Sequence, residues 1–266
     1  MSDAVLTTVD DGVATIMLNR PEVLNAGNRD LLGGLRAALE SAEHDDAVDA
    51  ILLTGAGRGF CAGADLTAGN WWPDGLTIGE GVAWVLEEWW NPCARAIAGS
   101  SKPTVAAVNG VAAGGGIGLA LACDIVVAAE SASFVQVFGP QLALVPDVGS
   151  TWWVPRLIGP ARARGLMMLG DKLPAPTAKE WGLIWECVPD GDLVEVTRSL
   201  AGQLGSYDRE AMRSIRAILD GGMDRSFDEQ LDVERDENGR LPNLPGFMEG
   251  MAAFIERRPP DFRRAR

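Results

Sequence analysis

The chain has 266 residues and a formal net charge of −14 at pH 7. A surface this acidic disfavours nucleic acid as a partner, because the phosphate backbone would repel it. With 47% hydrophobic and 23% charged residues, the composition is typical of a globular protein. No apolar run reaches the length of a membrane span, and the start has no signal-peptide pattern, so we expect no membrane partner.

Cysteine and histidine are few and dispersed. The four cysteines form no CxxC pair, which argues against a zinc site or a redox dithiol and fits a reducing, cytoplasmic environment. His44, the single histidine, stands in the polar stretch 43–46 and is expected at the surface. Catalysis by a Ser–His–Asp or Cys–His arrangement is therefore disfavoured.

Apolar segments separated by helical patterns predict an α/β architecture. Four segments without alternating polarity are predicted to be strands of a parallel sheet, buried on both faces: residues 13–18, 50–54, 104–108 and 125–129. A helix is predicted after the N-cap Asn28, because leucines recur at positions 31, 35 and 39. Beyond Gly159 the pattern becomes mainly helical, in segments 160–169, 178–182, 193–204, 209–219 and 227–235.

The segment 70–90 is unusually rich in tryptophan, with Trp71, Trp72, Trp84, Trp89 and Trp90 among the nine of the chain. Two interpretations are open. The segment could be a buried aromatic wall or subunit contact. Alternatively, it could be a flexible cover over a substrate pocket, since long irregular segments often act as lids.

Two turns rich in glycine and alanine, residues 60–66 and 109–118, each follow an apolar segment. Small side chains let the backbone approach a ligand, and one N–H group from each turn could meet at a single oxygen as an oxyanion hole. Close packing of a helix on a strand would explain the glycines at 114–116 about as well. Neither a dinucleotide-binding context nor the GK[ST] of a P-loop is present.

The chain resembles the crotonase (enoyl-CoA hydratase/isomerase) family over nearly its whole length. The segments that carry this resemblance, in the family's order, are 18–21, 24–26, 60–66, 102–110, 114–116, 123–125, 144–147 and 155–159, with Phe254 and Arg257. The resemblance implies an α/β fold in which residues 1–200 form a spiral of repeated ββα units. Residues 201–266 would form a helical region for trimerisation that also completes the CoA site.

The resemblance also implies an acyl-CoA thioester as substrate, with no metal and no cofactor beyond the CoA. The backbone N–H groups of Ala64 and Gly115 would form the oxyanion hole. The CoA would lie along Leu24, Ala62, Asp65 and Leu66. Phe254 and Arg257 match positions that approach CoA from a neighbouring subunit, in a homotrimer or a dimer of trimers.

The two glutamates that activate water in hydratases of this family are absent here. Gly118 stands at the first position, and Phe138 or Gly139 at the second, where the count indicates a one-residue insertion. Asp147 matches an acidic position of several isomerase branches, and the stretch 144–152 is most similar to phenylacetate-pathway isomerases. The resemblance thus favours double-bond isomerisation with Asp147 as base, although Asp147 would also suit a helix cap or a turn.

Other functions stay open at this point. A hydratase or related lyase would need a different acid, for which Asp65 and Glu80 are candidates. A CoA-binding protein without turnover is also compatible with the loss of both glutamates. A dehalogenase with an aspartate nucleophile is less favoured, because it commonly needs a histidine base.

Overall fold

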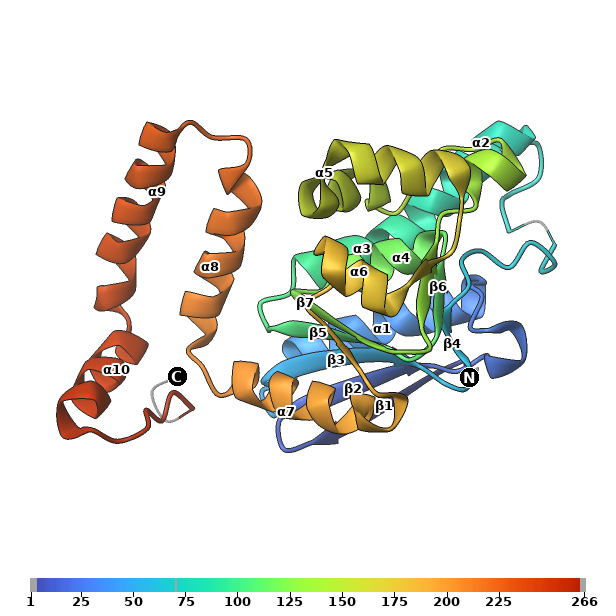
Figure 1. Ribbon diagram of the computed structural model, residues 1–266. Helices are drawn as coiled ribbons and strands as arrows, with labels where there is room; N and C mark the ends of the chain where they lie inside the picture. Colours follow the sequence, from blue (N-terminus) through green and yellow to red (C-terminus); the bar gives the residue numbers. More distant parts are fainter. Residues whose placement is uncertain (1–3, 70, 264–266) are drawn as a thin grey trace.

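The computed structural model describes residues 4–69 and 71–263, and its core is built on a six-stranded sheet (Figure 1). The strand order is β1-β2-β3-β5-β7-β10, and only β1 and β2 pair antiparallel. The bounds are β1 Val5–Asp10, β2 Val13–Leu18, β3 Ala50–Gly55, β5 Thr104–Val108, β7 Ile125–Ala129 and β10 Glu186–Val188. The strands predicted from apolar segments are thus confirmed, and so is their parallel pairing.

A smaller sheet has the order β4-β6-β8-β9. Its strands are β4 Gly59–Cys61, β6 Val111–Ala113, β8 Ser133–Val135 and β9 Leu173–Pro174. The pairs β3/β4, β5/β6 and β7/β8 each place the first strand in the larger sheet and the second in the smaller one. Helical segments follow each pair, so the expected spiral of ββα units is confirmed.

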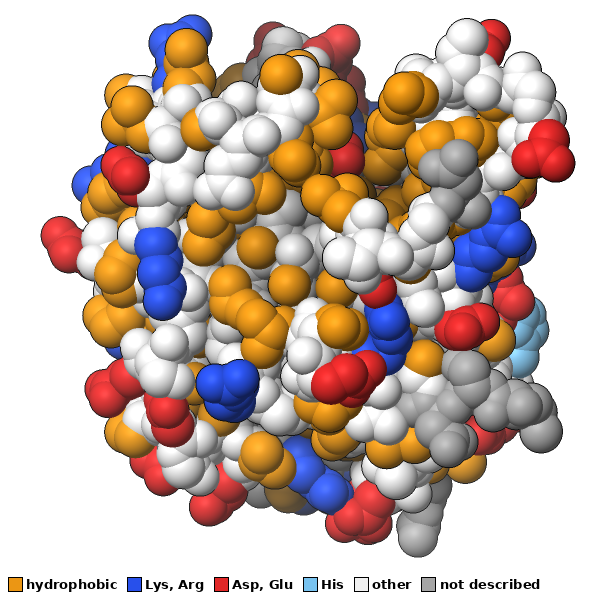
Figure 2. Space-filling model, turned by 90° about the vertical axis from the view of Figure 1, so that its right-hand side faces the viewer, with side chains coloured by type: hydrophobic (Ala, Val, Ile, Leu, Met, Phe, Trp, Pro, Cys, Tyr) orange, Lys and Arg blue, Asp and Glu red, His pale blue; other side chains and the backbone are white. Residues whose placement is uncertain are grey.

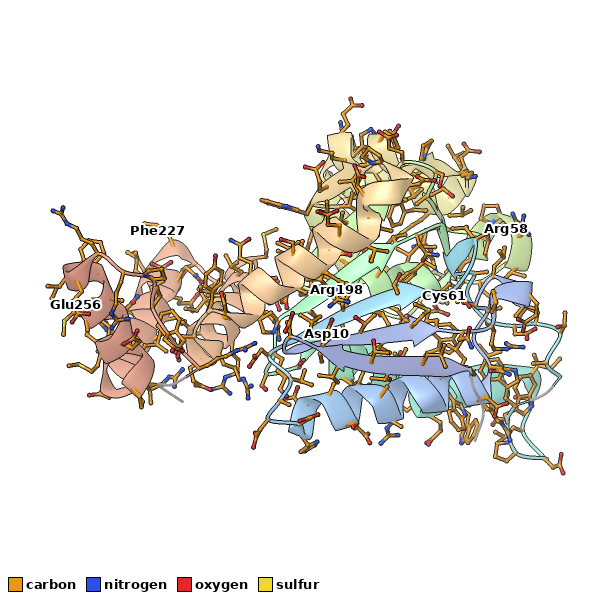
Figure 3. All side chains as sticks on the ribbon, turned by 90° about the horizontal axis from the view of Figure 1, so that it is seen from below. Asp10, Arg58, Cys61, Arg198, Phe227 and Glu256 are labelled. Carbon is orange, nitrogen blue, oxygen red and sulfur yellow. The ribbon has the colours of Figure 1, made fainter. Side chains whose placement is uncertain are left out.

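Helices cover the larger sheet. The helix α1 (Arg29–His44) begins where predicted, since the Asn28 side chain accepts a hydrogen bond from the Leu31 N–H at 2.9 Å. It packs against β1 and β2, whereas α7 (Leu193–Gly205) packs against β3 and β5. An ion pair between Asp10 and Arg198 joins β1 to α7 (Figure 3). The other helices of the core are α2 Ile78–Val85, α3 Asn91–Ala98, α4 Gly115–Leu121, α5 Ser150–Leu169 and α6 Ala175–Trp181.

Short helical turns connect these elements. The 3-10 turns are η1 Pro21–Val23, η4 Asp190–Asp192 and η5 Leu241–Asn243. Two further segments, η2 (Leu86–Trp90) and η3 (Phe138–Leu142), are π-helical. The segment η3 lies between Phe134 and Pro146, where the sequence indicates a one-residue insertion.

The C-terminal helices project away from the core as an arm (Figures 1 and 3). They are α8 Arg209–Gly222, α9 Phe227–Arg240 and α10 Pro245–Glu256. The boundary expected at residue 200 falls within α7, which belongs to the core because it packs on the sheet. Large apolar side chains are exposed on the arm: Phe227, Leu231, Phe247, Met248, Met251, Phe254 and Ile255. A single arm therefore leaves apolar surface uncovered.

No helix among the described residues is both long and apolar enough to cross a membrane.

Candidate active site

A cavity of about 410 Å³ lies between the two glycine-rich turns, the tryptophan-rich segment and the loop that ends at Asp147. On the face seen in Figure 2, hydrophobic side chains gather in the upper and central parts and most acidic ones lie nearer the edges. Most of the residues that line the cavity have apolar side chains or are glycines.

The two predicted turns touch each other at the base of this cavity. A Cβ atom at Gly63 would lie 3.0 Å from the carbonyl oxygen of Ala113, and one at Gly116 would overlap the carbonyl of Cys61. Only glycine permits backbones to approach this closely. Ala64 and Gly115 both line the cavity, and their backbone N–H groups have no hydrogen-bond partner among the described residues. This arrangement suits an oxyanion, which needs two unpaired donors.

Asp147 lines the same cavity. Its Oδ1 atom is buried and has no hydrogen-bond partner in the described part of the chain. Burial raises the pKa of this carboxyl to about 6, because the charged form loses its hydration. A carboxylate with that pKa is a stronger base than an exposed aspartate and is still ionised at neutral pH.

The other candidate acids are engaged elsewhere. Asp65 lines the cavity, but its carboxylate forms a 2.9 Å ion pair with Arg20. Hydrogen bonds from Thr67 and from Arg20 lower the pKa of Asp65. Glu80 completes the capping box of α2 with Thr77 and does not line the cavity. Asp147 is therefore the one carboxylate among the described lining residues that is free of an ion pair.

The two positions at which hydratases of the family were expected to carry glutamates hold Gly118 and either Phe138 or Gly139 in this chain. A Cβ at Gly118 would overlap the backbone carbonyl of Val148, so no side chain can extend into the cavity from this position without displacing that residue. The second position falls in the π-helical turn η3, where Phe138 lines the cavity and Gly139 does not. Neither position offers an acidic side chain to the cavity.

The expected CoA-binding residues divide into two groups. Ala62, Asp65 and Leu66 line the cavity, and Leu24 adjoins them because its carbonyl accepts the N–H of Ala62 at 3.0 Å. Phe254 and Arg257 belong to the end of the arm, and within one chain they do not line the cavity. The phenyl ring of Phe254 is 86% exposed.

Sequence reasoning left the tryptophan-rich segment undecided between a wall and a cover. Trp71, Trp72 and Trp90 line the cavity, and Trp71 and Trp90 are buried. Trp90 lies between Gly27 and Gly115, where a Cβ would approach its ring to 2.6 and 2.9 Å. The segment therefore forms an aromatic wall of the site, and the absence of a side chain at these glycines makes room for it.

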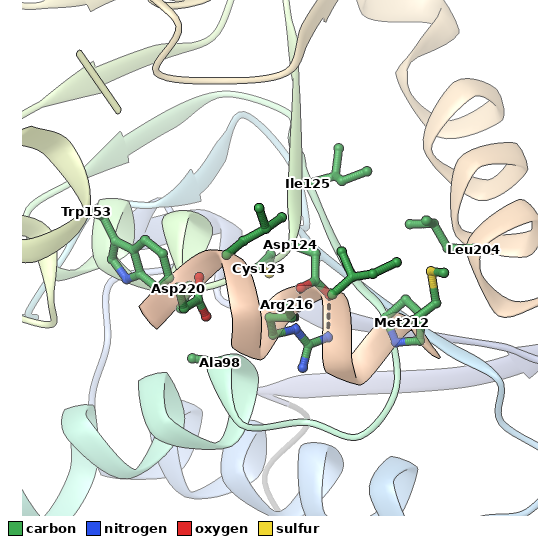
Figure 4. A pocket seen from close by; sticks show the side chains of 13 residues that line it. Ala98, Cys123, Asp124, Ile125, Trp153, Leu204, Met212, Arg216 and Asp220 are labelled. Atoms are coloured by element: carbon green, nitrogen blue, oxygen red, sulfur yellow. Dashed lines mark hydrogen bonds and ion pairs between the residues drawn. The ribbon is translucent and has the colours of Figure 1, made fainter. Parts of the chain in front are cut away.

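A second cavity, of about 300 Å³, lies between α8 and the core (Figure 4). It is mainly apolar, and the ion pair between Arg216 and Asp124 stands at its edge. Arg216 also donates hydrogen bonds to the carbonyls of Ser100 and Lys102. These contacts attach the arm to the core. Within residues 4–69 and 71–263, no group of three His, Cys, Asp or Glu side chains is placed to hold a metal ion.

Known proteins are similar to this chain over nearly its whole length. Over 98% of its length the chain is 43% identical to 1,2-epoxyphenylacetyl-CoA isomerase of Escherichia coli (strain K12), covering 99% of that protein. It is 42% identical to a probable enoyl-CoA hydratase of Rhodobacter capsulatus, with 96% of this chain and 95% of that protein aligned.

Among solved structures, an enoyl-CoA hydratase from Bacillus anthracis superposes with a TM-score of 0.88 at 31% identity, covering 98% of this chain and 99% of that one. The sequence pattern of the family described as enoyl-CoA hydratase/isomerase matches residues 8–265. The chain belongs to the enoyl-CoA hydratase/isomerase family.

Proposed function

We propose that this protein is an acyl-CoA isomerase in which Asp147 moves a proton while Ala64 and Gly115 hold the thioester oxygen. One observation carries the proposal: Asp147 is the carboxylate of the described cavity lining that makes no ion pair, and its Oδ1 atom is buried without a partner. The cavity is lined by one carboxylate of this kind and by two residues with unpaired N–H groups, and a single base suffices for moving a double bond.

The reaction follows from these groups. Asp147 removes a proton from a carbon of the acyl chain, and the electron pair shifts through the conjugated system onto the thioester oxygen. The N–H groups of Ala64 and Gly115 stabilise that negative charge, and one such donor contributes about 3 kcal/mol to the transition state. The protonated Asp147 then returns the proton to a different carbon. The proposal requires no metal and no cofactor beyond the CoA of the substrate.

The cavity wall favours a ring-bearing acyl group. Trp71, Trp72, Trp90 and Phe138 supply aromatic surface around the space beside Asp147, and flat rings pack well on such walls. The E. coli relative is named as an isomerase of 1,2-epoxyphenylacetyl-CoA, a thioester with a ring next to the acyl carbons. We propose an aryl-derived acyl-CoA as the substrate class.

Self-association is part of the proposal. The arm leaves Phe227, Phe247, Phe254 and Ile255 exposed, and a chain of this kind hides such surface by packing against copies of itself. We propose a trimer, alone or paired into a hexamer, in which Phe254 and Arg257 reach the CoA of a neighbouring subunit. Removing residues from Phe254 onward should then weaken CoA binding.

The test is the isomerase activity of an Asp147→Asn variant on enoyl-CoA and aryl-derived CoA thioesters. We expect kcat to fall by about a thousandfold, with acyl-CoA binding retained in calorimetry. The matched control is Asp74→Asn, which removes an exposed carboxylate that does not line the cavity. An active Asp147→Asn enzyme would overturn the role of Asp147.

Two further results would overturn the proposed reaction. Rapid loss of the conjugated enoyl absorbance of crotonyl-CoA, without isomerisation of any substrate, would identify a hydratase. Tight acyl-CoA binding without conversion across the whole panel would identify a binding protein.

A further inference from the structure

The residue after Asp147 has an unusual backbone conformation. Val148 has φ = 51°, and Gly149 follows with φ = 77°. A positive φ is a steric outlier for a β-branched residue, and such a conformation persists only where the surrounding structure enforces it. The Val148 side chain is 3% exposed, so the strained residue is fixed in the core and not in a mobile loop.

Glycines on the neighbouring helix α4 leave the space that this conformation needs. A Cβ at Gly118 would overlap the Val148 carbonyl oxygen and would lie 2.7 Å from its Cβ atom. A Cβ at Gly115 would lie 3.1 Å from Cγ2 of Val148. The backbone and side chain of Val148 therefore occupy the space that two missing side chains leave on one face of α4.

The same turn determines where Asp147 points. The Ser150 N–H donates a 2.9 Å hydrogen bond to the Asp147 carbonyl, which fixes the backbone of Asp147 at the start of α5. Val148 is held in the core, and its neighbour Asp147 lines the cavity. No described hydrogen bond holds its Oδ1 atom, so the position of Asp147 depends on how the turn is packed.

We propose that Val148, seated against Gly118, is the positioning residue that holds the carboxylate of Asp147 in the cavity. This inference rests on the proposed function, in which Asp147 is the base. The inference gives Gly118 a role of its own. Besides lacking the glutamate of the hydratases, this position leaves room for Val148. Any side chain at residue 118, a glutamate included, would clash with the present position of Val148.

The first experiment replaces Val148 by smaller residues and measures kcat and KM. The same substitution at a second buried valine, Val154, is the control. Val154 is also fully buried, lies in α5 and does not line the cavity, so Val154→Ala controls for the loss of core packing. We expect Val148→Ala and Val148→Gly to lower kcat between about tenfold and a hundredfold, the effect of misplacing a reacting group by about 1 Å. The KM should change less than twofold, and Val154→Ala should leave both constants near wild type.

The second experiment measures the pH dependence of kcat and combines substitutions at Val148 and Gly118 in one double variant. In Val148→Gly the carboxylate can turn towards water, so the acid limb of the kcat profile should move from about pH 6 towards the range of an exposed aspartate. Gly118→Ala should displace Val148 and lower kcat similarly. The Gly118→Ala/Val148→Gly double variant should lose less than the product of the single losses, because both changes disturb one contact.

Failure of this inference differs from failure of the proposed function. If Val148→Gly and Gly118→Ala keep the wild-type kcat and acid limb, or if their losses multiply, the positioning role is overturned. The titration of Asp147 can also be followed without turnover, as the pH dependence of unfolding that Asp147→Asn abolishes. An unchanged titration in Val148→Gly would overturn the inference even if the reaction were a different one.

Discussion

The indole ring of Trp90 lies against Gly115, with its Cζ3 atom 2.9 Å from the point where a Cβ would stand. One contact thus joins the aromatic wall to the residue whose N–H faces the cavity. The ring fills space that any side chain at residue 115 would need. In the proposed function, binding of the acyl group and stabilisation of its oxygen therefore depend on the same packing.

A Gly115→Ala substitution tests this contact. The added methyl group must push Trp90 or Val148 aside, which should displace the N–H and lower kcat by about a hundredfold. Gly165→Ala is the control, because nothing lies within 4 Å of that position in α5 and alanine is the better helix former. Steady-state kinetics and thermal unfolding of both variants provide the check. Wild-type turnover in Gly115→Ala would contradict the proposed oxyanion hole.

The raised pKa of Asp147 predicts a stability change with pH. Because burial raises the pKa to about 6, ionisation of Asp147 disfavours the folded state, and this part of the stability is lost as pH rises from about 4 to 6. Asp147→Asn cannot ionise and should be the more stable protein at pH 7, by at most about 3 kcal/mol. Below pH 4 the difference should vanish. Urea unfolding of both proteins at several pH values measures this difference. Equal free energies of unfolding for the wild type and Asp147→Asn at pH 7 would be evidence against burial of the charge.

The ion pair between Arg20 and Asp65 predicts the opposite pH dependence. Hydrogen bonds from Thr67 and Arg20 lower the pKa of Asp65, so its contribution to stability is present at neutral pH and is lost as pH falls below about 4. Arg20→Ala leaves a buried carboxylate without its ion-pair partner, and we expect a loss of about 2 kcal/mol. Arg36→Ala removes an exposed ion pair with Glu40 and should change stability by less than about 0.5 kcal/mol. Equal losses of unfolding free energy for the two variants in denaturant titrations would contradict a stabilising role of the Arg20–Asp65 ion pair.

Arg216 is expected to hold the arm against the core. It pairs with Asp124 and donates to two backbone carbonyls, so Arg216→Ala should free α8 and expose the cavity beneath it. We predict faster proteolysis near residue 209 and a smaller oligomer in light scattering. The control is Arg213→Ala, on the same helix, which loses only an exposed pair with Glu210. If Arg216→Ala keeps both the wild-type mass and the proteolysis rate, the anchor role is wrong.

The sequence by itself determined the elements whose signals are local. Apolar segments predicted β2, β3, β5 and β7, and the Asn28 cap predicted the start of α1. Small side chains marked both turns, since only they allow close backbone approach. The family resemblance pointed to Asp147.

Tertiary structure decided what depends on contacts between distant segments. The strands of the smaller sheet are two or three residues long, too short for a periodic signal. Asp65 is neutralised by a residue 45 positions away, and Trp90 meets Gly27 and Gly115 only after folding. No local preference predicts a left-handed valine at residue 148, because this conformation is unfavourable for the isolated residue. It exists because Gly118 leaves room for its carbonyl, a relationship that arises when α4 and α5 pack together.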